Sequence, residues 1–126
     1  METMTTACVQ LNAQASNKTE AVRLAGQLLV TAGYIAPAYI DSMLRREAVA
    51  NTFLGAGVAI PHGMVEDRHH ILHTGVAVVQ FRSGVTWKDG DRAQLVVAIA
   101  AKSDEHIVLL AEEHTSHPPS PARSLW

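Results

Sequence analysis

The sequence predicts an α/β domain in which a mixed β-sheet is flanked by helices. Two segments with helical spacing of apolar residues come first, short β-branched and glycine-rich segments follow, and a third helical segment comes after them. This order is typical of a sheet that packs between helices. A chain of 126 residues fits one domain, and a domain of this size buries roughly two-thirds of the surface that the unfolded chain exposes.

The first helix is predicted to begin after Asn17. Glu20 follows three residues later, as in a capping box, in which the two side chains bond to free backbone N–H groups. Apolar residues then recur at helical spacing, and Gly33 is expected to end the helix. These apolar positions are Ala21, Val22, Leu24, Ala25, Leu28, Leu29 and Ala32.

A second helix of about a dozen residues is predicted after Pro37, a residue that suits the first turn of a helix. The basic pair Arg45-Arg46 and Glu47 fall near its C-terminal end. Its apolar stripe consists of Ile40, Met43, Leu44 and Val49.

The pattern changes to strands and tight turns from Thr52 onward. We expect turns around Gly55, Gly57 and the triplet 61–63, one strand over Thr74–Phe81 and a nearly all-apolar strand over Gln94–Ala101. Residues 88–91, Lys-Asp-Gly-Asp, should form the turn between these strands.

The third helix is predicted to follow Ser103, with acidic residues in its first turn and His106 at the third helical position. Residues 114–126 follow no period and contain three prolines. We therefore expect a domain over residues 1–113 and an irregular tail over 114–126. The tail is either a flexible terminus or the product of a shifted reading frame.

Composition excludes several classes of function. A formal net charge of -2 and 17% charged residues do not fit a polyanion binder, so no nucleic-acid partner is expected. The longest strongly apolar run, Leu95–Ala101, is too short to span a bilayer, and the N-terminus has no signal-peptide core. We expect a cytoplasmic protein. The single cysteine, Cys8, cannot form an internal disulfide.

The triplet Pro61-His62-Gly63 holds the most promising reactive residue. Pro61 restricts the backbone before the histidine, and Gly63 should leave room for another molecule to approach. A neutral imidazole is a competent nucleophile near pH 7. By itself, the triplet favours a turn histidine that bonds only to backbone groups.

Other motifs predict no further chemistry. His69 and His73 would stand roughly 13 Å apart on an extended strand at about 3.3 Å per residue, so no metal site is expected. We interpret Glu66-Asp67-Arg68 as a solvated loop. No phosphate-binding loop that ends in Gly-Lys-Ser or Gly-Lys-Thr is present, and we expect no cofactor.

Six blocks of residues, in this order and at matching spacing, resemble one known family over roughly the first 110 residues. They are 43–47 (Met-Leu-Arg-Arg-Glu), 52–55 (Thr-Phe-Leu-Gly), 57–63 (Gly-Val-Ala-Ile-Pro-His-Gly), 74–76 (Thr-Gly-Val), 84–87 (Gly-Val-Thr-Trp) and 99–106, which ends in Asp-Glu-His. The chain thus resembles the enzyme IIA domain of the bacterial sugar phosphotransferase system, fructose/mannitol type.

The resemblance implies a three-layer α/β/α fold whose C-terminal helices are truncated here. It implies that His62 is the phosphorylated histidine, and that His106 and Arg46 lie beside it. The phosphoryl donor would be the carrier protein HPr, and the acceptor would be a cysteine of an enzyme IIB domain. This relay would serve the uptake of fructose or a mannitol-like sugar, with a membrane reached only through the transporter complex.

Two alternatives remain open. The chain also resembles regulatory enzyme IIA modules of the nitrogen-related type, whose phosphorylation state controls partner proteins. It could instead be an inactive truncated fragment, in which loss of the later helices leaves Val108, Leu109 and Leu110 open to solvent.

Overall fold

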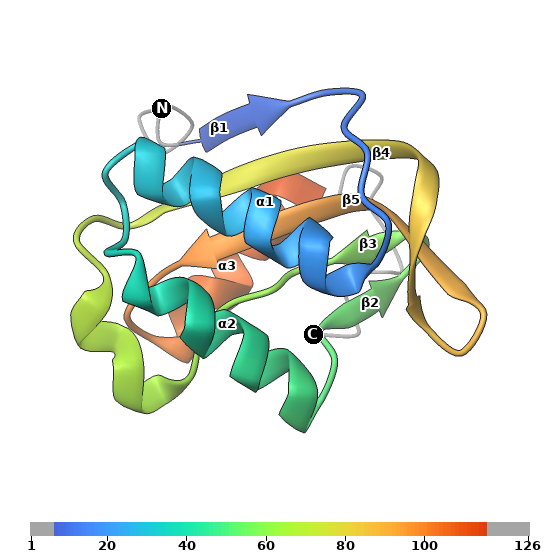
Figure 1. The fold of residues 1–126 in the computed structure, drawn as a ribbon. Helices are drawn as coiled ribbons and strands as arrows, with labels where there is room; N and C mark the ends of the chain where they lie inside the picture. Colours follow the sequence, from blue (N-terminus) through green and yellow to red (C-terminus); the bar gives the residue numbers. More distant parts are fainter. Residues whose placement is uncertain (1–6, 116–126) are drawn as a thin grey trace.

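The computed structural model describes residues 7–115, which form a five-stranded mixed sheet between helices (Figure 1). The strand order across the sheet is β1-β4-β5-β3-β2. The strands are β1 (Ala7–Gln10), β2 (Phe53–Gly55), β3 (Val58–Ala59), β4 (Gly75–Lys88) and β5 (Asp91–Ala100). The helices are α1 (Lys18–Thr31), α2 (Ala38–Val49), α3 (Asp104–Thr115) and a 3-10 helix, η2 (Val65–His70).

The two long strands form the centre of the sheet. β4 and β5 pair antiparallel, while β1 runs parallel to β4 and β3 runs parallel to β5. Both predicted strands are confirmed, but β4 continues to Lys88, because the chain stays paired with β5 across a register shift between Gln80 and Val85. The last five residues of β5 are buried, as expected for a strand covered on both faces.

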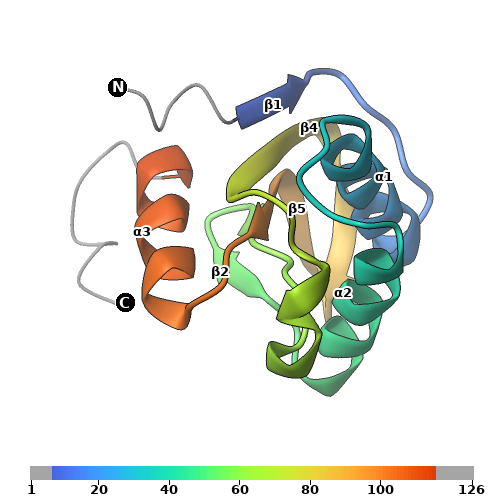
Figure 2. The same ribbon diagram turned by 90° about the vertical axis from the view of Figure 1, so that its left-hand side faces the viewer.

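Figure 2 shows the sheet between two layers of helix. Helices α1 and α2 cover one face, and α3 covers the other. Each face has its own cluster of buried apolar side chains, and the cluster beneath α1 and α2 is the larger. The predicted layered α/β architecture is confirmed.

Helix α1 begins where the capping box was predicted. The Asn17 side chain accepts a hydrogen bond from the backbone N–H of Glu20 at 2.9 Å, and the Glu20 carboxylate accepts one from the N–H of Ser16 at 2.8 Å. Gly33 follows the helix with a φ of +84°, a conformation that glycine adopts without strain. Helix α2 also matches its predicted length.

Two expectations about exposure are wrong. Residues 65–70 form the 3-10 helix η2 instead of a solvated loop, and both Asp67 and Arg68 lie partly buried. Leu110 is only 2% exposed, because it packs on the sheet, whereas Val108 and Leu109 do face outward.

Helix α3 runs to Thr115, two residues beyond the expected domain end. The rest of the predicted tail lies outside the described residues. Within residues 7–115, none of the helices has the length and hydropathy that a membrane span requires.

Candidate functional site

His62 lies on the segment that leads from β3 to η2, and the sheet holds this segment from two sides. The Ile60 N–H donates to the carbonyl of Thr52 at 3.0 Å, which extends the pairing between β2 and β3. The carbonyl of Pro61 accepts a hydrogen bond from the N–H of Ile99 in β5, also at 3.0 Å. The backbone before His62 is therefore held in place by two strands.

Helix α2 holds the backbone after His62. The Gly63 N–H donates to the hydroxyl of Tyr39 at 2.9 Å, and the Met64 N–H donates to Oγ of Ser42 at 2.8 Å. A Cβ atom at Gly63 would lie 2.5 Å from the Tyr39 ring and 2.8 Å from Oγ of Ser42. The glycine thus makes room for helix α2, not for another molecule as we expected from the sequence.

One ring nitrogen of His62 forms a hydrogen bond with the backbone two residues earlier. Nδ1 lies 2.8 Å from the carbonyl oxygen of Ile60. A carbonyl oxygen only accepts hydrogen bonds, so Nδ1 carries the proton and Nε2 keeps its lone pair. Burial lowers the pKa of His62, and the Ile60 carbonyl opposes this by favouring the charged ring. The neutral ring with a free Nε2 is the nucleophilic form.

Charged side chains from three elements act electrostatically on or near this ring. The positive charges of Arg46 and Arg68 lower the pKa of His62, after burial and the opposing Ile60 hydrogen bond, while the carboxylate of Glu47 raises it. Asp104, at the start of α3, has its pKa lowered chiefly by its hydrogen bond to Arg68, and His62 and Arg46 add to this effect. Arg46 is therefore close enough to act electrostatically on His62, and its role in the site stays a prediction.

Arg46 makes no ion pair with Asp41 or Glu47 in the described part of the chain. Its Nη1 donates instead to the carbonyl of Ala50 at 2.6 Å, just beyond the end of α2. Glu47 is buried and bonds to other groups. The guanidinium of Arg46 thus caps the C-terminal end of its helix close to His62.

Arg68 is the charged residue that sequence reasoning missed. Its Nη2 donates to Oδ1 of Asp104 at 2.6 Å and its Nη1 to the carbonyl of Lys102 at 3.3 Å. The side chain is only 16% exposed, and its Nε is buried with no hydrogen-bond partner among the described residues. No local pattern signals this role, since the pairing with Asp104 spans 36 positions.

His106 lies in the first turn of α3 and is partly buried. Its backbone N–H donates a hydrogen bond to Oγ of Ser103 at 3.1 Å, as the predicted cap requires. Within residues 7–115, no hydrogen bond or ion pair joins the His106 ring to His62. Its placement beside His62 stays a prediction.

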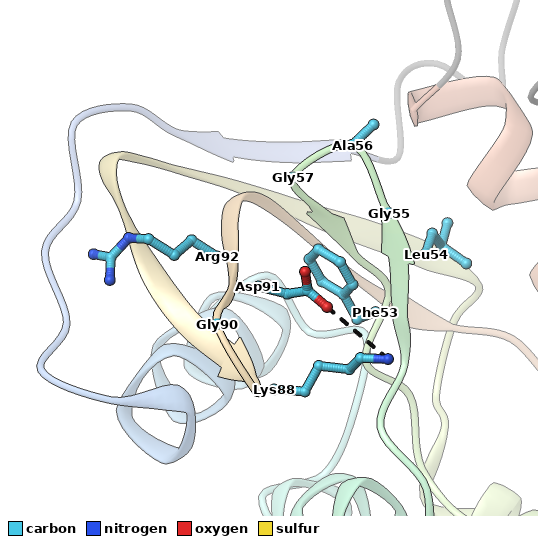
Figure 3. Close-up of a pocket in the computed structure, with 9 residues that line it drawn as sticks. All are labelled: Phe53, Leu54, Gly55, Ala56, Gly57, Lys88, Gly90, Asp91 and Arg92. Atoms are coloured by element: carbon cyan, nitrogen blue, oxygen red, sulfur yellow. Dashed lines mark ion pairs between the residues drawn. The ribbon is translucent and has the colours of Figure 1, made fainter.

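A hollow of about 540 Å³ lies away from His62, between the β2–β3 turn and the β4–β5 turn (Figure 3). Its charged groups bond to their own hairpin: Lys88 lies 3.9 Å from Asp91, and Arg92 donates to backbone carbonyls of Ser83 and Gly84. In the part of the chain that the structure describes, no three His, Cys, Asp or Glu side chains gather as metal ligands would.

The sequence of the chain matches a known protein family. The family model of the phosphoenolpyruvate-dependent sugar phosphotransferase system, EIIA 2, matches residues 2–112. The chain belongs to this family. It is therefore an enzyme IIA domain of type 2, as the six motif blocks predicted.

Curated relatives agree with this assignment. The chain is 56% identical over 102 residues to a multiphosphoryl transfer protein of Xanthomonas campestris, covering 81% of the chain but 12% of that protein. It is 42% identical over 104 residues to a mannitol-specific phosphotransferase enzyme IIA component of Geobacillus stearothermophilus, covering 82% of the chain and 72% of the relative. The IIA domain thus spans a small part of the multiphosphoryl transfer proteins that it matches.

Solved structures share the fold. The crystal structure of IIA mannitol from Escherichia coli has a TM-score of 0.78 and 37% identity, covering 93% of this chain and 92% of that one. The same TM-score is found for the Escherichia coli complex of enzyme IIA mannitol with phosphorylated enzyme IIB mannitol, at 36% identity over 93% of this chain and 90% of that one.

Proposed function

We propose that Nε2 of His62 accepts a phosphoryl group from phosphorylated HPr and passes it to the cysteine of an enzyme IIB domain. The observation that carries this proposal is the hydrogen bond from Nδ1 to the Ile60 carbonyl, which leaves Nε2 as the nitrogen with a free lone pair. The ring is aimed by a backbone that β5, β2 and α2 hold. A rigidly held nucleophile suits phosphoryl transfer, because this reaction is catalysed mainly by positioning and charge.

Each transfer is a balanced displacement. The Nε2 lone pair of His62 attacks the phosphorus of the donor phosphohistidine, the donor's N–P bond breaks, and the donor imidazole keeps that electron pair. In the second step a cysteine thiolate attacks the same phosphorus, and the Nε2–P electron pair returns to His62. Nδ1 keeps its proton, and its bond to Ile60, throughout.

The charges near His62 suit this exchange. A phosphoryl group adds roughly two negative charges near pH 7. Arg46 and Arg68 both act electrostatically on the ring, and an opposite unit charge about 4 Å away gains about 4 kcal/mol at an effective dielectric near 20. We propose that Arg46 binds the phosphoryl oxygens directly and that the ring of His106 adds a donor from the first turn of α3.

The likeness to the IIA mannitol protein supports a IIB partner, since that protein has been solved in complex with phosphorylated IIB mannitol. The likeness to multiphosphoryl transfer proteins supports a place in a relay with more than one phosphoryl transfer. We propose that the relay serves the uptake of fructose or of a mannitol-like sugar, and that the sugar itself does not contact this domain.

The test is phosphorylation in a mixture of phosphoenolpyruvate, enzyme I and HPr, followed by mass spectrometry of the intact protein. We expect the wild type to gain one phosphoryl group and His62→Ala to gain none. His106→Ala should still gain it but should transfer it to an added IIB domain more slowly. Full phosphorylation of His62→Ala would refute the proposal.

An exposed histidine provides the control. His73 lies outside the site, so His73→Ala should behave as the wild type in both steps.

Two-dimensional NMR of the phosphorylated protein labelled with ¹⁵N should place the phosphorus on Nε2. Phosphorylation at Nδ1 would contradict the geometry on which the mechanism depends.

A further inference from the structure

Glu47 is a buried carboxylate that the mechanism so far does not use. It lies on α2 next to Arg46 and is 5% exposed. Three donors satisfy it: Oε2 accepts from the N–H of Thr52 at 2.7 Å and from Nε1 of Trp87 at 2.8 Å, and Oε1 accepts from the Thr52 hydroxyl at 2.8 Å. Two of the three bonds therefore hold a single residue, Thr52.

Thr52, just before β2, is one of the two residues whose backbone bonds to the segment that leads into His62. Its carbonyl accepts the N–H of Ile60 at 3.0 Å, and the carbonyl of Ile60 accepts Nδ1–H of His62 at 2.8 Å. A continuous series of hydrogen bonds thus runs from the carboxylate of Glu47 through Thr52 and Ile60 to the imidazole. Every bond in it is 3.0 Å or shorter.

The length of the Glu47 side chain lets its two oxygens reach both polar groups of Thr52. A carboxylate accepts at both oxygens, so it binds the backbone N–H and the hydroxyl of Thr52 at once. Such bonds to an ionised acceptor are stronger than neutral ones. Losing these hydrogen bonds would leave a buried charge without partners, which costs free energy. The carboxylate therefore keeps the Thr52 and Trp87 donors in place.

We propose that Glu47 is a positioning residue, which holds Thr52 and, through Thr52 and Ile60, keeps the ring of His62 in the tautomer and orientation that present Nε2. This inference rests on the proposed role of His62 as the nucleophile. Glu47 itself touches neither the ring nor the phosphoryl group; it acts by keeping the Ile60 carbonyl where Nδ1 needs it.

Two substitutions separate positioning from charge. Glu47→Asp keeps the charge but withdraws the carboxylate by one methylene, so it cannot reach Thr52 and Trp87 together. Glu47→Gln keeps the length and an acceptor oxygen for the Thr52 N–H and Trp87, and its amide group can donate to the Thr52 hydroxyl. The matched control is Asp41→Asn, which removes an exposed carboxylate from the same helix.

The first measurement is the ¹⁵N chemical shift of both His62 ring nitrogens, which reports the tautomer without any phosphoryl transfer. The second is the rate of phosphoryl uptake from phosphorylated HPr at pH 7. We expect Glu47→Asp to give averaged shifts, indicating mixed tautomers, and uptake that is slower by on the order of tenfold to a hundredfold. Glu47→Gln should keep the tautomer and stay within about threefold of the wild-type rate.

The pKa of His62 gives a third readout. Arg46 and Glu47 on α2 and Arg68 on η2 act electrostatically on the ring, and His62 in turn acts on Asp104 of α3. The negative charge of Glu47 favours the protonated ring, so Glu47→Gln should lower the pKa of His62 further, whereas Asp41→Asn should leave it unchanged.

A folded Glu47→Asp protein with the wild-type tautomer and rate would overturn the proposal. If Glu47→Asp does not fold, Thr52→Val tests the proposal instead. This substitution nearly keeps the shape of Thr52 but removes the hydroxyl that bonds to Glu47. We expect a partial change of tautomer and about threefold slower uptake, and wild-type values of both would overturn the proposal. If the wild type itself takes up no phosphoryl group, the nucleophile assignment fails, while the ring-nitrogen shifts still report on Glu47.

Discussion

The two helical faces of the sheet stabilise the molecule in different ways. On one face, the buried side chains of Tyr39 and Ser42 in α2 accept hydrogen bonds from the backbone of the His62 segment. Glu47, also in α2, contacts this segment indirectly, through Thr52. On the other face, α3 is held by apolar packing of Ile107, Leu110 and Ala111 against the sheet. Figure 2 shows the two layers on either side of the strands.

Asp104 of α3, which lies near the site, is more exposed than the two polar residues of α2 that bond to the His62 segment. The side chain of Asp104 is 86% exposed, although it pairs with the partly buried Arg68. Tyr39 and Ser42, in contrast, are fully buried. This contrast indicates that α2 sets the geometry of the His62 segment, while α3 covers the sheet and places the charge of Asp104 near His62.

The largest expected effect comes from disrupting the contact with α2. Gly63→Ala places a methyl group 2.5 Å from the Tyr39 ring, so α2 and the His62 segment must separate. We expect a loss of about 3 kcal/mol in the free energy of unfolding, from overpacking, and phosphoryl uptake reduced at least tenfold. Urea denaturation and the uptake assay measure the two effects.

Gly33→Ala is the control for this substitution. Gly33 has a positive φ, but no atom lies within 4 Å of the position that an added Cβ would take, so only backbone strain of about 1 kcal/mol is expected. Equal losses for the two variants would show that steric contact with α2 is not what requires glycine at position 63.

The next largest effect tests how much the apolar packing of α3 on the sheet stabilises the fold, by comparing two neighbouring leucines. Leu110 is 2% exposed and Leu109 is 56% exposed. We expect Leu110→Ala to lower the free energy of unfolding by about 2–3 kcal/mol and Leu109→Ala by less than about 0.5 kcal/mol. Phosphoryl uptake by the folded fraction should change little in either variant. A large loss of uptake by folded Leu110→Ala would show that α3 also sets the geometry of His62.

A smaller effect tests a single polar contact of α2. Tyr39→Phe keeps the ring but removes the hydroxyl that accepts the Gly63 N–H, which leaves a buried donor unsatisfied. We expect a loss of about 1–2 kcal/mol in the free energy of unfolding and slower phosphoryl uptake. Tyr34→Phe, at a partly exposed tyrosine, should cost less than about 0.5 kcal/mol. Identical thermal transitions for Tyr39→Phe and the wild type would contradict this role.

The smallest effect concerns pH. Burial lowers the pKa of His62 in the folded protein below the value of about 6.5 expected for the unfolded chain. The unfolded chain therefore binds the proton first, and stability is lost as the pH falls from about 6.5 toward the lower folded pKa. In His62→Gln this part of the pH dependence should disappear. Urea denaturation between pH 7.5 and pH 5 measures it.

Other groups titrate in a different window. Hydrogen bonds lower the pKa of Asp67, mainly through Ser42 and then Arg45, and that of Asp104, through Arg68, below the ordinary value of 3.8. Their contributions are present above that value and are lost at more acidic pH. His73→Gln, at an exposed position, is the control and should keep the wild-type slope near pH 6. An unchanged slope in His62→Gln would contradict the buried environment of His62.

Much of the fold could be predicted because its signals are local. The capping pair Asn17 and Glu20, the apolar run in β5 and the Ser103 cap of α3 depend on residues within a few positions of one another. The solvated-loop interpretation of Arg68 failed for the opposite reason, since its burial depends on Asp104 and Lys102 from another part of the chain.

Periodicity, capping and motif order are properties of the chain, so the sequence alone was enough to predict the three α-helices, the two long strands, the family, and the histidine proposed to carry the phosphoryl group. The folded structure was needed to establish which ring nitrogen is free, why position 63 needs glycine, and that Glu47 bonds to Thr52 and Trp87 instead of Arg46. These features depend on which segments the sheet topology brings together, and contacts between positions 39 and 63 or 47 and 87 leave no mark in local spacing.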